Sequence, residues 1–201
     1  KHEAHIVVIG GKSDINESQI AVLELISKNR DRDIYILQGS FEENFFSFLK
    51  PYIKPYGLWW KVIDDSNITY EVDTGLFDNF KNVNIRKADF VVNQQKTDSL
   101  IYAVSYGSAG FEFAKRGEFI KASEFFNKAA DITSEFNNIN SAIELTKKAE
   151  DYSSGKEMLL KDKRIEPLME LATIYYTLGY FKGSMEINEK LVEIDPNNAV
   201  H

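Results

Sequence analysis

The chain has no cysteine, which excludes disulfide bonds, thiolate metal ligands and cysteine nucleophiles. Its three histidines, His2, His5 and His201, all lie at or near the ends of the 201-residue sequence. We therefore expect no Ser/His/Asp triad and no histidine acid–base pair inside the fold. These absences predict a protein that is not an enzyme and that has no metal or other cofactor.

Long apolar runs and an excess of positive charge are missing as well. No run approaches the roughly 18 apolar residues of a membrane-spanning helix, so direct membrane insertion is not expected. The formal net charge is −7, and residues 98–201 carry 17 acidic and 12 basic side chains. A surface of this sign does not attract phosphate backbones, which argues against nucleic acid as a partner.

The second half of the chain contains one pattern twice, at nine positions with a constant offset of 62 residues. Small and large residues alternate at helical spacing on both sides of a glycine. Small residues let two antiparallel helices approach closely, and large ones fill the spaces beside them. The first copy is Tyr106, Ala109, Gly110, Phe113, Gly117, Phe119, Ala122, Phe126 and Ala129, and the second is Leu168, Leu171, Ala172, Tyr175, Gly179, Phe181, Ser184, Asn188 and Leu191.

This spacing resembles the tetratricopeptide repeat, a helix–turn–helix unit of 34 residues. The second copy ends in Asp195-Pro196-Asn197-Asn198, a common ending in that family. It departs from the family pattern at Ser184, where alanine is preferred, and at Asn188, where an aromatic residue is preferred. The resemblance implies repeats over residues 103–136 and 165–198, in a protein that holds other proteins.

Residues 137–164, between the two copies, predict a degenerate middle repeat. One helical face is shared by Ala142, Leu145, Ala149 and Tyr152. We expect Ser153-Ser154-Gly155 to end that helix and a second one to begin near Met158. Without this unit the array has two repeats, fewer than usually suffice for stability.

In the tetratricopeptide family, the first helix of each hairpin lines a concave groove that binds extended peptides or partner helices. Phe111 and Thr173 stand where some members bind a terminal carboxylate with asparagine and lysine, so no such clamp is expected. Aromatic anchors at Phe111 and Tyr176 inside an acidic rim favour a partner of mixed basic and apolar character. The alternative is that these residues pack against the N-terminal half or a neighbouring repeat. The mapped positions are Val104, Gly107, Ser108, Phe111 and Lys115 in the first repeat, and Glu166, Met169, Glu170, Thr173, Tyr176 and Thr177 in the last.

Residues 1–97 lack the repeat and predict a small α/β sandwich with a mixed sheet. A hairpin around the turn at residues 64–67 is the reason for preferring a mixed sheet to a parallel one. The polar segment Lys96-Thr97-Asp98 places the boundary before an all-α array of tetratricopeptide-like hairpins over residues 98–201. Because no flexible linker separates the halves, we expect them to pack together. The expected elements are strands over residues 5–10, 33–37, 58–63, 68–72 and 89–92, a helix after Asp14, and a helix after Phe41 that Pro51 and Pro55 end.

The segment Gly10-Gly11-Lys12-Ser13, where glycines follow a predicted strand, is the basis for an alternative function. A phosphate loop requires a glycine where Ile6 stands, so the match is incomplete, although glycines before a helix can hold an anion. The alternative is therefore a small-molecule- or nucleotide-binding domain, an enzyme or sensor, that the repeats recruit. Asp73-Thr74-Gly75 matches the aspartic protease triplet but has no second copy, and a turn is predicted there. Asp64, Asp65 and Asp73 lack the spacing of a cation-binding loop, so no metal site is expected.

The sequence begins at Lys1, not at a methionine, and stops at His201, where another repeat helix is expected. We interpret it as a piece of a longer protein or as a processed mature form. With no cysteine, this interpretation favours a periplasmic or envelope-facing location over the cytoplasm. The leading hypothesis is a non-catalytic scaffold or adaptor that binds a protein partner within a larger bacterial assembly, such as a secretion, pilus or flagellar apparatus.

Overall fold

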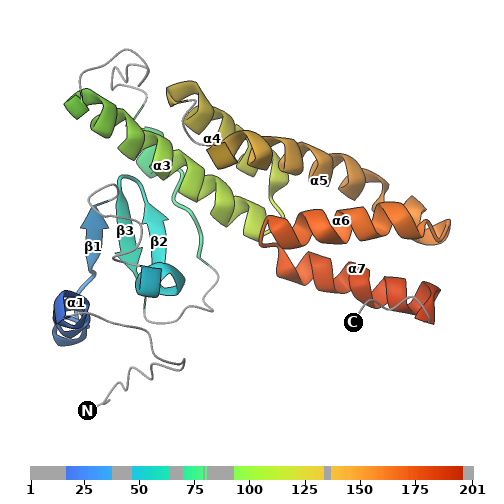
Figure 1. Cartoon of the computed structure of the whole chain (residues 1–201), viewed down its shortest axis with the longest axis horizontal. Coiled ribbons are helices and arrows are strands. Elements are labelled where there is room, and N and C mark those ends of the chain that lie inside the picture. Colours follow the sequence, from blue (N-terminus) through green and yellow to red (C-terminus); the bar gives the residue numbers. More distant parts are fainter. Residues whose placement is uncertain are drawn as a thin grey trace.

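The computed structural model describes residues 17–37, 47–63, 70–78, 80, 93–133 and 137–196. These residues have an α+β layout, in which a small antiparallel sheet lies beside a long helical half (Figure 1). The N-terminal elements are α1 (Glu17–Lys28), β1 (Tyr35–Leu37), the 3-10 helix η1 (Ser47–Tyr52), β2 (Ile53–Tyr56), β3 (Trp59–Val62) and the short α2 (Gly75–Asp78). The helical half consists of α3 (Asn93–Lys115), α4 (Phe119–Ile132), α5 (Asn137–Lys161), α6 (Ile165–Thr177) and α7 (Phe181–Ile194).

The sheet has the strand order β1-β3-β2, and both strand pairs are antiparallel. The described strands therefore pair in the antiparallel sense alone, and the strands expected over residues 5–10 and 89–92, on which the expected mixed sheet also depends, lie outside the described residues. The hairpin is also displaced: β3 pairs with β2 through a turn at Gly57, whose φ is +59°, and residues 70–73 form no strand. Pro55, expected to end a helix, lies in β2, because β2 is an edge strand and such strands tolerate proline.

Two helical hairpins, α3–α4 and α6–α7, confirm the helix–turn–helix packing that the repeated pattern predicts. Their turns contain Gly117 and Gly179, with φ angles of +76° and +78°, in the left-handed region that favours glycine. In both turns, the residue after the glycine donates its backbone N–H to the carbonyl oxygen five residues earlier, at 3.0 and 2.8 Å. The two hairpins are therefore built on the same turn.

The two departures from the family pattern have different structural outcomes. Ser184 is buried, and its Oγ donates a hydrogen bond to the carbonyl oxygen of Ala172 at 2.9 Å, which joins α7 to α6. Serine, like the alanine that the family prefers, is small enough to let α6 and α7 approach closely, and it adds one hydrogen bond between them. Asn188 is exposed, whereas its counterpart Phe126 is fully buried.

Helix α5 is one continuous helix of 25 residues, so the expected break at Ser153-Ser154-Gly155 is wrong. The hydroxyl of Ser154 donates to the carbonyl oxygen of Asp151 at 2.7 Å, a local bond that serine makes inside helices. A glycine in a helix costs only about 1 kcal/mol. This cost is outweighed by packing, because α5 contacts α4 and α6 extensively.

The two hairpins meet turn to turn, and α5 runs along both of them (Figure 1). A Cβ atom on Gly117 would lie 3.0 Å from Cζ of Tyr180, and one on Gly179 would lie 3.1 Å from Cγ of Lys115. The rings of Phe119 and Tyr175 stack between the hairpins with centroids 5.2 Å apart. Helices α3 and α6 therefore approach each other at their C-terminal ends and not along their lengths.

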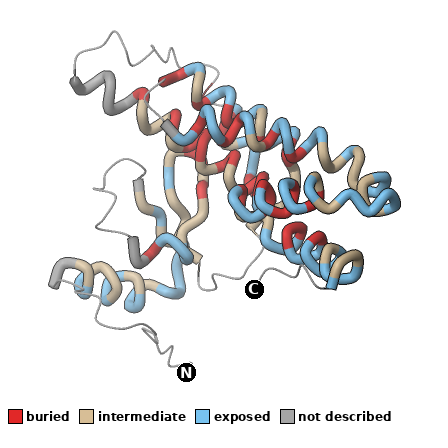
Figure 2. The backbone as a smooth tube through the Cα atoms, turned by 45° about the vertical axis from the view of Figure 1, so that its right-hand side comes forward, coloured by how far each residue is buried: buried red, intermediate tan, exposed pale blue. Residues whose placement is uncertain are grey.

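The sheet packs against α3, as expected for halves without a linker. The Oγ of buried Ser105 donates to the carbonyl oxygen of Gly57 at 2.7 Å, and Arg116 Nη1 donates to that of Tyr70 at 3.0 Å. Helix α3 begins at Asn93 and crosses the boundary predicted at residues 97 and 98. Figure 2 shows the buried residues gathered where the helices of the second half cross.

Tyr70 gives this interface a predicted pH dependence. Burial, together with the negative charges of nearby tyrosines and carboxylates, raises the pKa of Tyr70 from 10.0 to about 12. The unfolded chain loses this proton at a lower pH than the folded chain does. The Tyr70 contribution to stability is therefore complete below pH 10.0 and is lost as the pH rises through about 12.

We expect Tyr70→Phe to lose less stability than the wild type between pH 8 and pH 10.5. Urea unfolding of both proteins at the two pH values measures this difference. Identical losses in the two proteins would contradict the assignment, since other alkaline titrations are common to both.

Candidate functional site: the open face of the last hairpin

The partner-binding residues predicted on α6 lie together and are exposed. Met169 and Tyr176 expose 42% and 66% of their surface and stand two helical turns apart, on one face. Thr173 and Thr177 donate their hydroxyls to carbonyl oxygens four residues earlier, both at 2.9 Å. These threonines therefore have local hydrogen-bond partners and leave the apolar side chains as the prominent feature of α6. Glu166 and Glu170 are exposed on the same helix.

The residues predicted on α3 have different surroundings. Val104 and Ser108 are half-buried, and so is Phe111, whose ring packs edge-on against Phe126 with centroids 4.8 Å apart. Lys115 is exposed, with its Nζ 2.6 Å from Oε1 of Glu112. Of the two expected aromatic anchors, Tyr176 thus presents most of its surface and Phe111 serves the core of the first hairpin. Gly107, also mapped on α3, is buried.

Helix α7 adds three exposed apolar residues that the family mapping does not include. Phe181, Met185 and Val192 expose 56%, 62% and 47% of their surface. Their spacing of four and seven residues places them on one side of α7, beside the stripe that packs on α6. The ring of Phe181 contacts that of Tyr176, with centroids 5.5 Å apart, and joins the two helices. We call Met169, Tyr176, Phe181, Met185 and Val192 the open face.

The surroundings of the open face are acidic. Residues 165–196 carry six acidic and two basic side chains. Glu166 stands one turn before Met169 on α6, and Glu189 stands between Met185 and Val192 on α7. The open face is therefore apolar at its centre and negative at its edges.

Glu170, beside the edge of the open face on α6, is held ionised by hydrogen bonds from α5. Its carboxylate accepts from the hydroxyl of Tyr152 at 2.6 Å and from Nζ of Lys148 at 3.3 Å. The Tyr152 bond, followed by that of Lys148, lowers the pKa of Glu170. The Tyr152 bond also raises the pKa of Tyr152 itself, so the pair keeps one proton and one negative charge at neutral pH.

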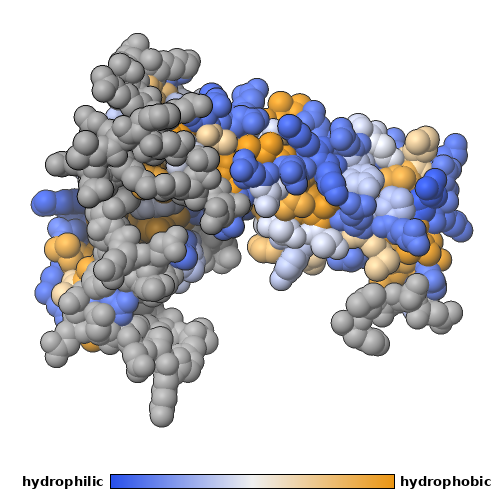
Figure 3. Space-filling view, turned by 45° about the horizontal axis from the view of Figure 1, so that its top comes forward, coloured by the Kyte–Doolittle hydropathy of each residue, from blue (hydrophilic) through white to orange (hydrophobic). Residues whose placement is uncertain are grey.

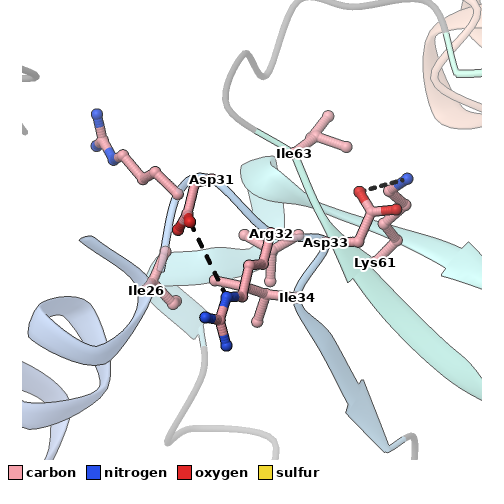
Figure 4. Close-up of a pocket in the computed structure, with 9 residues that line it drawn as sticks. Ile26, Asp31, Arg32, Asp33, Ile34, Lys61 and Ile63 are labelled. Atoms are coloured by element: carbon pink, nitrogen blue, oxygen red, sulfur yellow. Dashed lines mark ion pairs between the residues drawn. The ribbon is translucent and has the colours of Figure 1, made fainter. Parts of the chain in front are cut away.

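A second candidate, a surface hollow of about 550 Å³, lies between the end of α1 and β3 (Figure 4). Arg30, Arg32 and Lys61 line it, but Lys61 Nζ lies 2.9 Å from Oδ1 of Asp33, and Arg32 Nε lies 3.9 Å from Oδ2 of Asp31. The Lys61 hydrogen bond lowers the pKa of Asp33, which stays ionised and balances the lysine. Two of the three cations that line the hollow are thus paired with carboxylates of the hollow itself.

Other predictions for this part of the molecule have different outcomes. The anion-binding loop Gly10-Gly11-Lys12-Ser13 lies outside the described residues. Asp73 is found in the predicted turn, where its Oδ1 accepts the backbone N–H of Gly75 at 3.0 Å.

Within the described ranges, no group of acidic or histidine side chains is arranged to hold a metal ion, and no helix has the length and apolarity to cross a membrane.

No family model, curated protein or solved structure matches this chain. Assignment of a function therefore rests on the surface itself. Figure 3 shows apolar side chains reaching the surface among hydrophilic ones along the helical half.

Proposed function

We propose that this chain is a non-catalytic adaptor that binds a protein partner through the open face of α6 and α7. The observation that supports this proposal is a set of five large apolar side chains on one hairpin, each between 42% and 66% exposed. Contiguous apolar surface with a polar rim is typical of protein-interaction sites. Tyr176 and Phe181 are the proposed anchors, since aromatic residues dominate binding energies once they are desolvated.

We also propose that α3–α4 and α6–α7 are tetratricopeptide-like repeats. The common glycine turns, the nine recurring positions and the buried Ser184 at the helix crossing support this proposal. The proposed binding surface differs from the concave groove of first helices, because α3 and α6 are not neighbours along their lengths. It keeps Met169 and Tyr176 and adds the stripe of α7. The larger envelope-associated assembly stays a prediction.

A capture experiment with three immobilised proteins tests the adaptor function. These are the wild type, the double variant Tyr176→Ser/Met185→Ser, and the control Ile120→Ser, which changes an apolar residue on α4 that is 60% exposed. In extracts of the source cells, we expect a partner that the wild type and the control retain and that the double variant loses about tenfold or more. Equal capture by all three proteins would place the binding site elsewhere. Thermal melts establish that each variant is folded.

A further inference from the structure

The open face has a counterpart within the same chain. Its five positions correspond, 62 residues earlier, to positions on α3 and α4. There Ala114 is 0% and Phe119 is 6% exposed, whereas Tyr176 and Phe181 at the corresponding positions are more than half exposed. The counterparts are Gly107, Ala114, Phe119, Ser123 and Ala130, all of them buried or half-buried.

Helix α5 covers part of the face that these five positions form on α3 and α4. A Cβ atom on Gly107 would lie 3.3 Å from Cδ1 of Ile139, and α5 packs extensively against α4. Near the turn, the rings of Tyr175 and Tyr180 cover Phe119. The side of α5 that packs inward carries small or β-branched residues, and the buried ones are Ile139, Ala142, Ile143, Thr146 and Ala149.

We propose, building on the adaptor function above, that the partner element on the open face is a single amphipathic α-helix with a basic edge. Its apolar side carries aliphatic residues, because the corresponding face of the first hairpin is covered by such a helix. Its edges carry lysine or arginine, because the open face is surrounded by glutamates. A second copy of this chain is disfavoured, since it would bring two hairpins with six acidic and two basic residues each into contact.

One contact and one exposed residue refine the chemistry of this helix. Lys148 of α5 lies 3.3 Å from Glu170 of α6, so a covering helix in this fold already pairs a lysine with a glutamate at the edge of the hairpin. Asn188 is exposed between Met185 and Val192, at the position where the first hairpin has the buried ring of Phe126. A helix that covers the open face would bury this amide, and a buried amide needs a hydrogen-bonding residue on the facing helix. The partner helix therefore carries one hydrogen-bonding side chain within its apolar stripe.

The probe for this inference is a labelled, end-capped synthetic peptide with the sequence of residues 137–152, the first part of α5, in which the exposed Glu144 and Glu150 are replaced by lysine to give it the proposed basic edge. Fluorescence anisotropy with the full chain measures its binding. We expect the double variant Tyr176→Ser/Met185→Ser to weaken the peptide affinity by about tenfold or more and Ile120→Ser to leave it unchanged. A peptide with Lys147→Glu and Lys148→Glu is also expected to bind about tenfold more weakly than the parent peptide, with the difference shrinking at high salt.

Several outcomes would overturn the inference. These are absence of peptide binding at millimolar concentration, affinity unaffected by the double variant, or equal affinity for the charge-reversed peptide. A concentration-dependent dimer in analytical ultracentrifugation, lost in the double variant, would identify a second copy as the occupant. If the capture experiment identifies a partner that depends on the open face while the peptide does not bind, the adaptor function stands and the helical, basic partner is refuted.

Discussion

Replacing Glu112 with alanine is expected to lower the free energy of unfolding by about 3 kcal/mol. Glu112 lies on α3, where its Oε2 is 3.5 Å from Nζ of Lys54 in strand β2. The two side chains are only 10% and 11% exposed. Alanine would remove the carboxylate and leave the Lys54 ammonium in a nearly dry interface without this counterion. Lys115, the other cation at Glu112, is 46% exposed and keeps water as its partner.

Chemical unfolding of the full chain measures this effect, and Glu193→Ala is the matched control. Glu193 pairs with Lys190 at 2.8 Å, closer than the Lys54 pair, but its side chain is 64% exposed. A surface pair of this kind contributes little, so we expect the control to change stability by less than about 0.5 kcal/mol. The double variant Lys54→Met/Glu112→Leu is expected to recover much of the loss, because it removes both buried charges. Equal, small losses for Glu112→Ala and Glu193→Ala would mean that water reaches the interface.

This ion pair also shows what the sequence could not predict. Lys54 and Glu112 are 58 residues apart, and each is an ordinary charged residue in its own segment. Their contact depends on how β2 packs against α3. The sequence predicted that the two halves pack together, because it contains no flexible linker, but not which residues meet.

The helical hairpins could be predicted because their determinants are local. Gly117 and Gly179 mark turns that need a positive φ, and the small residues that allow close packing lie within the same 34-residue unit. Helix α5 was predicted incorrectly because the determinant is tertiary. Packing against α4 and α6 stabilises the helix through Gly155, where local preference favours a break.

The sequence predicted that the N-terminal half combines helices with a β-sheet, but it did not predict which strand segments pair with each other. The sequence predicts that Pro51 and Pro55 end a helix, which is the effect of proline in a helix interior. In the structure, Pro55 occupies an edge strand, where a missing N–H need not break the ladder. The identity of an edge strand depends on the whole sheet order, which a single segment does not reveal.

The α6 part of the candidate site could be predicted from the sequence, whereas the α7 part was missed. The family mapping identified Met169 and Tyr176 because it follows the first helix of each hairpin. It did not include Phe181, Met185 and Val192, although their helical spacing beside a separate packing stripe was a usable signal. The exposure of this stripe depends on the position of α5, which covers the first hairpin more fully than the last.

A pair of glycine-to-alanine substitutions tests both the hairpin packing and the continuity of α5. In Gly110→Ala, the added Cβ atom would lie 2.7 Å from two ring carbons of Phe126. Phe126 is fully buried and its ring also contacts Phe111, so it has little room to move. We expect a net loss of roughly 1–2 kcal/mol, the overpacking cost less the gain in helix propensity.

Gly155→Ala makes the same chemical change with the opposite expected sign. No atom outside the local helix lies within 4 Å of a Cβ atom built on Gly155, and the residue is inside α5. Alanine there is expected to raise the free energy of unfolding by about 0.5–1 kcal/mol, because glycine is the poorer helix former. Urea unfolding of both variants beside the wild type gives the comparison directly. A destabilising Gly155→Ala would indicate that α5 ends near this glycine, as the local sequence suggested, and a neutral Gly110→Ala would show that the first hairpin packs more loosely at Phe126 than the structure has it.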